Sequence, residues 1–301
     1  NNINTRHLND GVGIKGMLKD LFMLPFDLRN FWYFNRKSKS KKVFIFYNPH
    51  PLNWVYALFI NYFISESSVC NVLHEPYKSN KEKLKYGLFK YFYFLIVQIA
   101  QFSSVWQSKV IITMSPNGSI LFKNRFPKFK GHHISANLLF ERTKIKGHFE
   151  RRYFSFVGMV NKAKGIYDFI DLVNYSLSCE DNIEYCLISS SNLRDYIPLL
   201  EKGYERKLKI INRSYISDID IYDVIEQSYA VFSIHNVAAQ SGVLPIAYSL
   251  NTPSIMRDIP AFTQYKIDDN LVVPSNFTSE EIHSVCLNLM GNKNNFYTFV
   301  R

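Results

Sequence analysis

The chain has 301 residues, of which 47% are hydrophobic, and it carries a formal net charge of +11. This length suits one large domain or two of ordinary size. No run of about 20 apolar, uncharged residues occurs, which excludes a conventional membrane-spanning helix. No signal peptide is visible at the start, and the first residues resemble the interior of a protein.

The charge is distributed unevenly along the chain. Residues 1–150 hold 22 Lys and Arg against 8 Asp and Glu, a net of +14, whereas residues 151–301 hold 14 against 17, a net of −3. A basic half predicts a polyanionic neighbour, either nucleic acid or an anionic membrane surface. Lysines flank aromatic residues at 80–98, as in helices that lie among lipid headgroups; a buried core helix is the alternative. Nucleic acid is not expected, because no recognition motif accompanies the charge.

The first half alternates short apolar runs with helical segments. The segment GVGIKG at 11–16 matches a glycine-rich dinucleotide fingerprint, but no strand precedes it, so it is interpreted only as a loop that enters a helix. An apolar turn is predicted at 131–140 and a linker at 141–152. Strands are predicted at 43–48, 68–74 and 109–114, and helices at 52–64, 82–105 and 116–125.

The second half repeats this alternation. Strands are predicted at 153–158, 183–189, 208–211, 230–234, 253–256 and 270–274, and helices at 164–178, 192–206, 218–228, 241–250 and 278–290. Apolar strands separated by helices are typical of parallel sheets covered on both faces. The sequence therefore predicts an α/β protein with two Rossmann-like domains, residues 1–148, which lack a first strand, and residues 149–301.

Candidate binding residues are those that follow predicted strands, because ligands of parallel sheets bind at the carboxyl ends of the strands. A lysine after a glycine turn offers a charge to a phosphate, and Ser241 and Gly242 at a helix start offer a hydroxyl and N–H groups. A phosphate-bearing ligand is predicted; solvated helix starts, helix capping and a buried structural histidine are the alternatives. The candidates are His74, Glu75, Asn117, Gly158, Lys162, Lys164, Gly165, His235, Gln240, Ser241 and Gly242.

Three segments carry a resemblance to family 4 glycosyltransferases. FVGMVNKAKGIYDFIDLV at 156–173 resembles their phosphate-binding strand, loop and helix, written F-V-G-R-x-x-x-x-K-G. QSGVLPIAYSLNTPSIMRDIPAFTQY at 240–265 resembles their nucleotide-sugar segment. VCNVLHEP at 69–76 resembles their first-domain strand, which ends in a histidine followed by an acidic residue. Together these segments extend the resemblance over residues 43–290.

The resemblance implies a GT-B fold, with two Rossmann-like domains facing across a cleft. It also implies transfer of a sugar, typically a hexose, with retention of configuration, from a nucleoside-diphosphate-sugar to a lipid-linked saccharide. Lysine, arginine and helix dipoles would stabilise the leaving diphosphate, so neither a metal nor another cofactor is expected; the scattered cysteines (Cys70, Cys179, Cys186 and Cys286) show no metal-ligand spacing. Such enzymes build surface polysaccharide, such as lipopolysaccharide, which implies a cytoplasmic protein held peripherally at the inner face of the cell membrane.

The resemblance also implies roles for individual residues. His74 would be the catalytic residue that faces the donor sugar. The acceptor side would hold Gly11, Gly13, Glu75 and Asn117. The donor would contact Gly158, Lys162, Lys164, Gly165, His235, Gln240, Ser241 and Gly242.

The sequence departs from the family at three positions. Met159 stands where an arginine is expected, and Lys162 differs from it in reach and geometry. Ala238 and Ile246 stand where paired glutamates are expected, although the Gln-Ser-Gly that follows Ala239 matches a variant of some members. Two alternatives stay open: a non-catalytic subunit on the same fold, and a nucleotide-sugar 2-epimerase, which needs more carboxylates than Glu75 and Asp258 offer.

Overall fold

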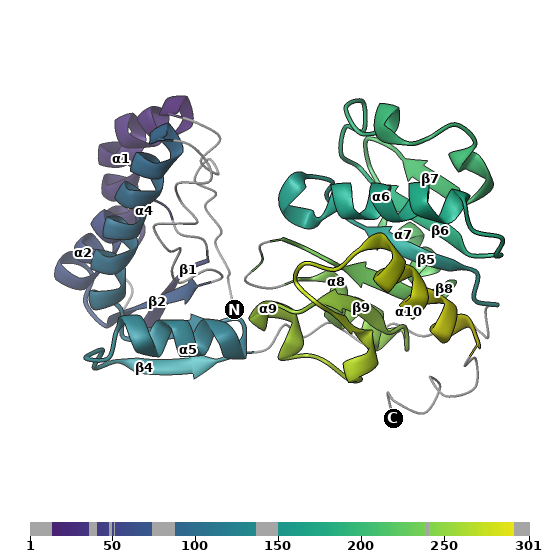
Figure 1. The fold of residues 1–301 in the computed structure, drawn as a ribbon. Coiled ribbons are helices and arrows are strands. Elements are labelled where there is room, and N and C mark those ends of the chain that lie inside the picture. The colour runs from purple at the N-terminus through teal and green to yellow at the C-terminus, as the bar shows by residue number, and fades with distance from the viewer. Residues whose placement is uncertain are drawn as a thin grey trace. The chain divides into compact units, whose positions relative to one another are not determined.

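The structure is a computed structural model that describes residues 14–35, 41–47, 50, 52–73, 88–136, 150–236, 238 and 241–291. The chain divides into two compact units, Asn1–Asn137 and Leu138–Arg301 (Figure 1). Each unit is built on a parallel sheet, which confirms the predicted α/β class with two Rossmann-like domains. Among the described helices, none is long and apolar enough to cross a membrane.

The N-terminal unit contains a four-stranded parallel sheet in the order β1-β2-β3-β4. The helix α5 begins where it was predicted, because the hydroxyl of Ser115 accepts a hydrogen bond from the Gly118 N–H at 2.9 Å and Pro116 occupies the first turn. The elements are α1 (Ile14–Asn35), β1 (Lys42–Phe46), α2 (Asn53–Phe63), β2 (Ser67–Leu73), α4 (Leu88–Trp106), β3 (Val110–Thr113), α5 (Pro116–Arg125) and β4 (His132–Ser135).

The turn predicted at 131–140 was wrong, because this segment contains β4. The strand pairs in parallel with β3, with His132 opposite Val110. β4 is a short edge strand, and its exposed residues His132, Ile134 and Ser135 do not alternate with buried apolar ones. The strand is stabilised by its pairing with β3, so a local hydrophobic pattern does not predict it.

The C-terminal unit contains a six-stranded parallel sheet in the order β10-β9-β8-β5-β6-β7. The chain starts at β5, moves outward through β6 and β7, and returns to β8 on the other side of β5, which is the Rossmann order. The elements are β5 (Tyr153–Val157), a 3-10 turn (Lys162–Lys164), α6 (Ile166–Leu177), β6 (Glu184–Ser189), β7 (Leu208–Asn212), α7 (Asp218–Glu226), β8 (Ser228–Ser233), α8 (Val243–Ser249), β9 (Ser254–Arg257), α9 (Pro260–Thr263), β10 (Val272–Val273) and α10 (Ser279–Gly291).

The helix predicted at 192–206 was also wrong. The segment forms two single-turn 3-10 helices, Ile197–Leu199 and Tyr204–Arg206. Pro198 cannot donate a helical hydrogen bond, and Gly203 takes a positive φ of 88° that ends a right-handed helix. Both residues break the periodicity that suggested a continuous helix.

The core of the C-terminal unit surrounds β5, all five residues of which are buried. Phe154 contacts the rings of Tyr185 and Phe232, and Phe169 contacts both of them from α6. Burying one such side chain contributes about 2–3 kcal/mol, so β5 is firmly fixed at the centre of the sheet. The residues that follow β5 are therefore held in a defined place.

Candidate functional site

The candidate site lies at the carboxyl ends of β5 and β8. These strands are neighbours in the sheet, and the strand order reverses between them. In open α/β sheets this reversal leaves a crevice where ligands bind. Gly158 follows β5 and His235 closely follows β8, so two predicted site residues lie at this point.

The loop after β5 is shaped by two glycines. Gly158 has φ of 104°, its N–H donates to the Ile188 carbonyl at 3.0 Å, and a Cβ there would meet nothing within 4 Å. Gly165 has φ of 80°, and a Cβ there would lie 2.3 Å from the carbonyl oxygen of Ile234. Between them, the side chain of Asn161 accepts a hydrogen bond from the Lys164 N–H at 3.1 Å. The loop therefore packs directly on the end of β8 and carries Lys164 there.

Replacing Gly165 by alanine is expected to destabilise the C-terminal unit by at least about 3 kcal/mol, because the new methyl group adds a backbone clash to the conformational strain. Gly158→Ala is the matched control: it adds strain of about 1–2 kcal/mol but meets no neighbour. Urea denaturation followed by circular dichroism measures both. Equal losses in the two variants would contradict the close approach to Ile234.

His235 is a buried residue close to two positive charges, those of Lys164 and Arg257. Its side chain is buried and packs edge-on against Phe262, with ring centroids 5.0 Å apart. Burial, followed by the positive charges of Lys164 and Arg257, lowers the pKa of His235 to about 3. Its Nδ1 is buried and has no hydrogen-bond partner among the residues that the structure describes. A neutral imidazole with an unused nitrogen is a hydrogen-bonding group available to a ligand.

The lowered pKa makes stability depend on pH. Between about pH 6.5 and pH 3 the unfolded state binds a proton at residue 235 and the folded state does not, so stability present above pH 6.5 is lost as the pH falls. We expect a loss of about 1.5–2 kcal/mol between pH 6.5 and pH 5. Hydrogen exchange of peptides covering β8 measures it, corrected for the intrinsic exchange rate at each pH. His235→Gln should flatten the dependence, whereas His132→Gln on the exposed strand β4 should retain it.

Arg257, which was not among the predicted site residues, ties the edge together. Its Nε donates to the Ile234 carbonyl at 3.1 Å, its Nη2 to the Asp168 carboxylate at 2.7 Å, and its Nη1 to the Ser275 carbonyl. The guanidinium also lies over the ring of Phe277, 4.5 Å from the centroid. Arg257 is the last residue of the β9 strand, so the rule that selected Lys164 and His235 would also have selected it.

Asn236 joins the same loops. Its backbone N–H donates to the Ala163 carbonyl at 2.9 Å, and its side-chain amide donates to the Lys162 carbonyl at 3.0 Å. These bonds connect the segment after β8 with the segment after β5. The structure thus brings together the loop 158–165, His235 and Arg257.

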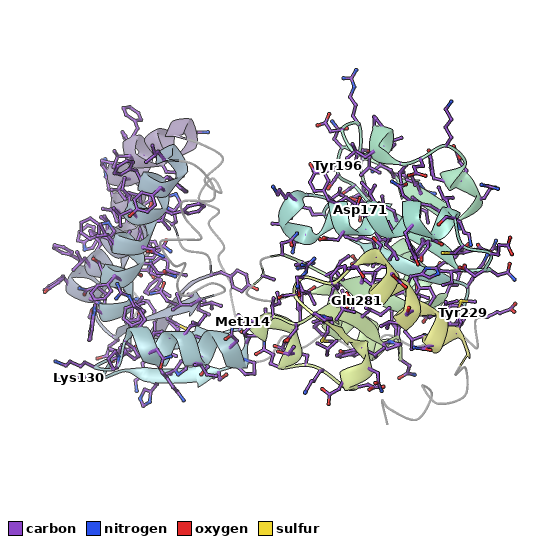
Figure 2. All side chains as sticks on the ribbon, in the orientation of Figure 1. Met114, Lys130, Asp171, Tyr196, Tyr229 and Glu281 are labelled. Atoms are coloured by element: carbon purple, nitrogen blue, oxygen red, sulfur yellow. The ribbon has the colours of Figure 1, made fainter. Side chains whose placement is uncertain are left out.

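The other predicted residues are placed as follows. Lys162 is exposed, Ser241 is buried, and Gly242 is the N-cap of α8 without a side-chain cap. Asn117 lies in the first turn of α5, just beyond Met114, which follows β3 (Figure 2). Met159, where an arginine was expected, is 66% exposed. Five predicted residues lie outside the described ranges: Gly11, Gly13, His74, Glu75 and Gln240.

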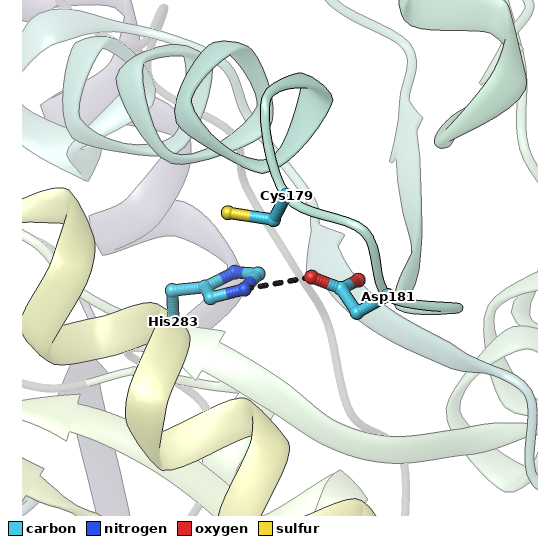
Figure 3. Close-up of side chains that lie close together, drawn as sticks. All are labelled: Cys179, Asp181 and His283. Carbon is cyan, nitrogen blue, oxygen red and sulfur yellow. Dashed lines mark hydrogen bonds and ion pairs between the residues drawn. The ribbon is translucent and has the colours of Figure 1, made fainter.

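A second polar cluster lies just before β6 begins, and so at the amino-terminal ends of the strands rather than at their carboxyl ends (Figure 3). Cys179, Asp181 and His283 offer ligand atoms that all lie within 4.8 Å of one another. His283 Nε2 lies 2.9 Å from one Asp181 oxygen, and Lys207 donates to the other oxygen at 2.9 Å. Burial alone would raise the pKa of Asp181. The hydrogen bonds from Lys207 and Ile183, together with the charges of Lys207 and His283, outweigh this effect and hold the pKa below its usual range. Because both carboxylate oxygens are engaged, the contacts shown tie α10 to the loop before β6.

The fold is GT-B, as predicted: solved structures that share it include three GT-B glycosyltransferases. TarM aligns with 91% of this chain at a TM-score of 0.62 and 13% identity. The trehalose-6-phosphate synthase OtsA aligns with 95% (TM-score 0.68, 10% identity), and sucrose-phosphate synthase from Thermosynechococcus elongatus with 94% (TM-score 0.66, 14% identity). The chain spans 53% of TarM, 70% of OtsA and 72% of the sucrose-phosphate synthase, and so only about half the length of TarM. No protein-family model and no curated protein matches the sequence.

Proposed function

We propose that this protein is a retaining, metal-independent glycosyltransferase that moves a sugar from a nucleoside-diphosphate-sugar to a lipid-linked saccharide. The observation that carries the proposal is the convergence of Lys164, His235 and Arg257 at the reversal of strand order in a GT-B fold. Positive charge at this edge matches the diphosphate of such a donor. The ligands of two structurally similar proteins support the proposal. S. aureus TarM was solved with UDP and alpha-GlcNAc-glycerol, and a trehalose-6-phosphate enzyme from E. coli was solved with UDP-2-fluoro glucose.

In the proposed complex, Lys164 binds the diphosphate and Lys162 assists from the exposed side of the same turn. Gly158 leaves open space for the donor, and Gly165 keeps the turn against β8. His235 offers its unused nitrogen as a hydrogen-bond partner. The segment Gln240, Ser241 and Gly242 contributes hydroxyl and N–H groups.

The remaining roles complete the proposal. His74 faces the donor sugar as the catalytic residue, and the acceptor side includes Gly11, Gly13, Glu75 and Asn117. Retention needs no protein nucleophile if the departing phosphate takes the acceptor proton on the same face of the sugar. The product is surface polysaccharide, such as lipopolysaccharide, made in the cytoplasm at the inner face of the cell membrane; the basic N-terminal half supports this location.

Calorimetric titration with UDP, GDP and CDP tests the donor site and identifies the base. We expect micromolar binding of one nucleotide in the presence of EDTA. Absence of binding to all three would overturn the proposal in favour of a non-catalytic subunit. Incubation with UDP-N-acetylglucosamine and no acceptor separates a transferase from a 2-epimerase, because only the epimerase would form the epimer.

A further inference from the structure

The helix α1 buries two carboxylates and exposes several large apolar side chains. Asp20 and Asp27 are buried, 3% and 8% exposed, whereas Phe22 and Phe26 are 75% and 55% exposed. Inside the unit, Asp27 accepts a hydrogen bond from the Tyr56 hydroxyl at 3.1 Å. A helix on the surface of a water-soluble protein normally directs its carboxylates outward and its rings inward. The outward side of α1 is therefore suited to an apolar neighbour.

The helix α4 likewise buries polar side chains, beside the apolar Ala100 and Val105, and exposes large apolar ones. Gln101 and Ser104 are buried, and the Asn71 amide donates to the Ser104 hydroxyl at 2.8 Å. From residue 91 to residue 106 the helix has no charged residue. The exposed side chains recur every three or four residues and so share one face of the helix. They are Leu88, Phe92, Ile96, Ile99, Phe102 and Trp106, each between 39% and 71% exposed.

The two helices belong to one layer, because α2 packs against both of them (Figure 1). Figure 2 shows the side chains that project from this layer. The three tryptophans of the chain lie in it, Trp32 on α1, Trp54 on α2 and Trp106 on α4, and each is 39–43% exposed. Contiguous apolar surfaces of this kind mark sites of interaction, and tryptophan is enriched where apolar and aqueous phases meet. We call the exposed sides of α1, α2 and α4 the aromatic face.

Charge distinguishes a lipid bilayer from a second protein copy as the occupant of this face. On α1, Lys19, Phe22, Phe26, Arg29 and Tyr33 follow at steps of three or four residues, so two cations and three rings share one side of the helix. All five side chains are exposed. A second copy would bring the same cations, and the same net +14 of residues 1–150, against themselves. Anionic headgroups would neutralise them.

We propose that the aromatic face lies in the headgroup region of an anionic bilayer, with Lys19 and Arg29 at the phosphates and the rings and aliphatic side chains below them. The helices then lie along the membrane surface. This inference gives the proposed membrane location a defined surface, and it rests on the proposed function only for its biological purpose. Its test requires neither donor nor acceptor.

The test is co-sedimentation of the full chain with vesicles. We expect binding to vesicles of equal phosphatidylglycerol and phosphatidylcholine, weakening as salt is added, and little binding to phosphatidylcholine alone. Ile96→Glu should lower the affinity at least tenfold, because it moves a charge into the apolar layer. Ile219→Glu is the matched control: Ile219 is 59% exposed on α7, in the other unit, and its substitution should change nothing.

Charge reversal tests the cations separately. Lys19→Glu combined with Arg29→Glu should lower binding to anionic vesicles at least 20-fold, about fivefold for each cation removed. Tryptophan emission should shift to the blue with anionic vesicles and remain shifted in the Ile219→Glu variant.

Two results would overturn the proposal. One is failure of the unaltered chain to sediment with anionic vesicles. The other is a dimer in sedimentation equilibrium that Ile96→Glu dissociates, which would assign the face to a second copy. Since no nucleotide is added, neither result bears on the donor site, and nucleotide titration remains the separate test of that site.

Discussion

Replacing Lys164 by alanine is expected to lower affinity for the nucleoside diphosphate about 100-fold and nearly to abolish sugar transfer, with the fold intact. A charge-assisted hydrogen bond to phosphate contributes about 1.5–3 kcal/mol, and each 1.4 kcal/mol is a factor of ten. The side chain makes this contribution, whereas the Lys164 backbone N–H keeps its bond to Asn161. Calorimetry measures the affinity, and release of nucleotide from the sugar donor measures turnover.

Two controls make the Lys164 result specific. Lys202→Ala removes an exposed lysine elsewhere in the C-terminal unit and should leave affinity and turnover unchanged. In the Lys164→Ala variant the pKa of His235 should rise, because the Lys164 charge is one of the causes that lower it. Nuclear magnetic resonance of the imidazole reports that pKa without substrate. Unchanged turnover in Lys164→Ala would reject the phosphate assignment.

Arg257→Met is expected to destabilise the C-terminal unit by about 3 kcal/mol. The substitution removes donors from the Ile234 and Ser275 carbonyls and from the Asp168 carboxylate, and an unpaired buried group costs about 1–3 kcal/mol. The Asp168 side chain is 30% exposed, so water compensates part of its loss. Urea denaturation measures the change in the free energy of unfolding.

The shape of the guanidinium decides between two explanations for Arg257. If the planar fork matters, Arg257→Lys should lose most of the same stability, because an ammonium does not reach three acceptors in this geometry. If the positive charge alone matters, the free energy of unfolding of the Arg257→Lys variant should be close to that of the unaltered protein. Asp168→Asn, which keeps an acceptor oxygen, should cost about 1 kcal/mol or less. A loss below about 1 kcal/mol in Arg257→Met would contradict a positioning role.

The sequence predicts the sheets well because parallel strands buried on both faces are continuously apolar. β5 and β6 are examples, since nearly every side chain in them is buried. The glycine turn after β5 can also be predicted from the sequence. Gly165 has a positive φ and lies against the Ile234 carbonyl, so both its conformation and the space around it favour glycine. Lys164 and His235 follow from the rule that polar residues after such strands form sites.

Other features depend on contacts that a linear pattern does not contain. β4 is stabilised by pairing with β3, and Arg257 finds its three acceptors on three separate segments, 18, 23 and 89 residues away in the sequence. The exposed apolar residues of α1 and α4 have the same three-to-four-residue spacing as the buried residues of ordinary helices. Only the observed burial of Asp20 and Ser104 shows which side faces inward.

The exposed apolar side of α4 has a practical consequence for protein engineering. A soluble variant would ordinarily be sought by leaving the apolar side of a helix intact and changing its polar side. On α4 that choice would disrupt the interior, because the polar side chains of Gln101 and Ser104 are buried, and it would leave the exposed apolar side unchanged. Hydrophilic replacements at Leu88 and Ile99, which are 71% and 60% exposed, would instead reduce the exposed apolar surface at little cost to the packing.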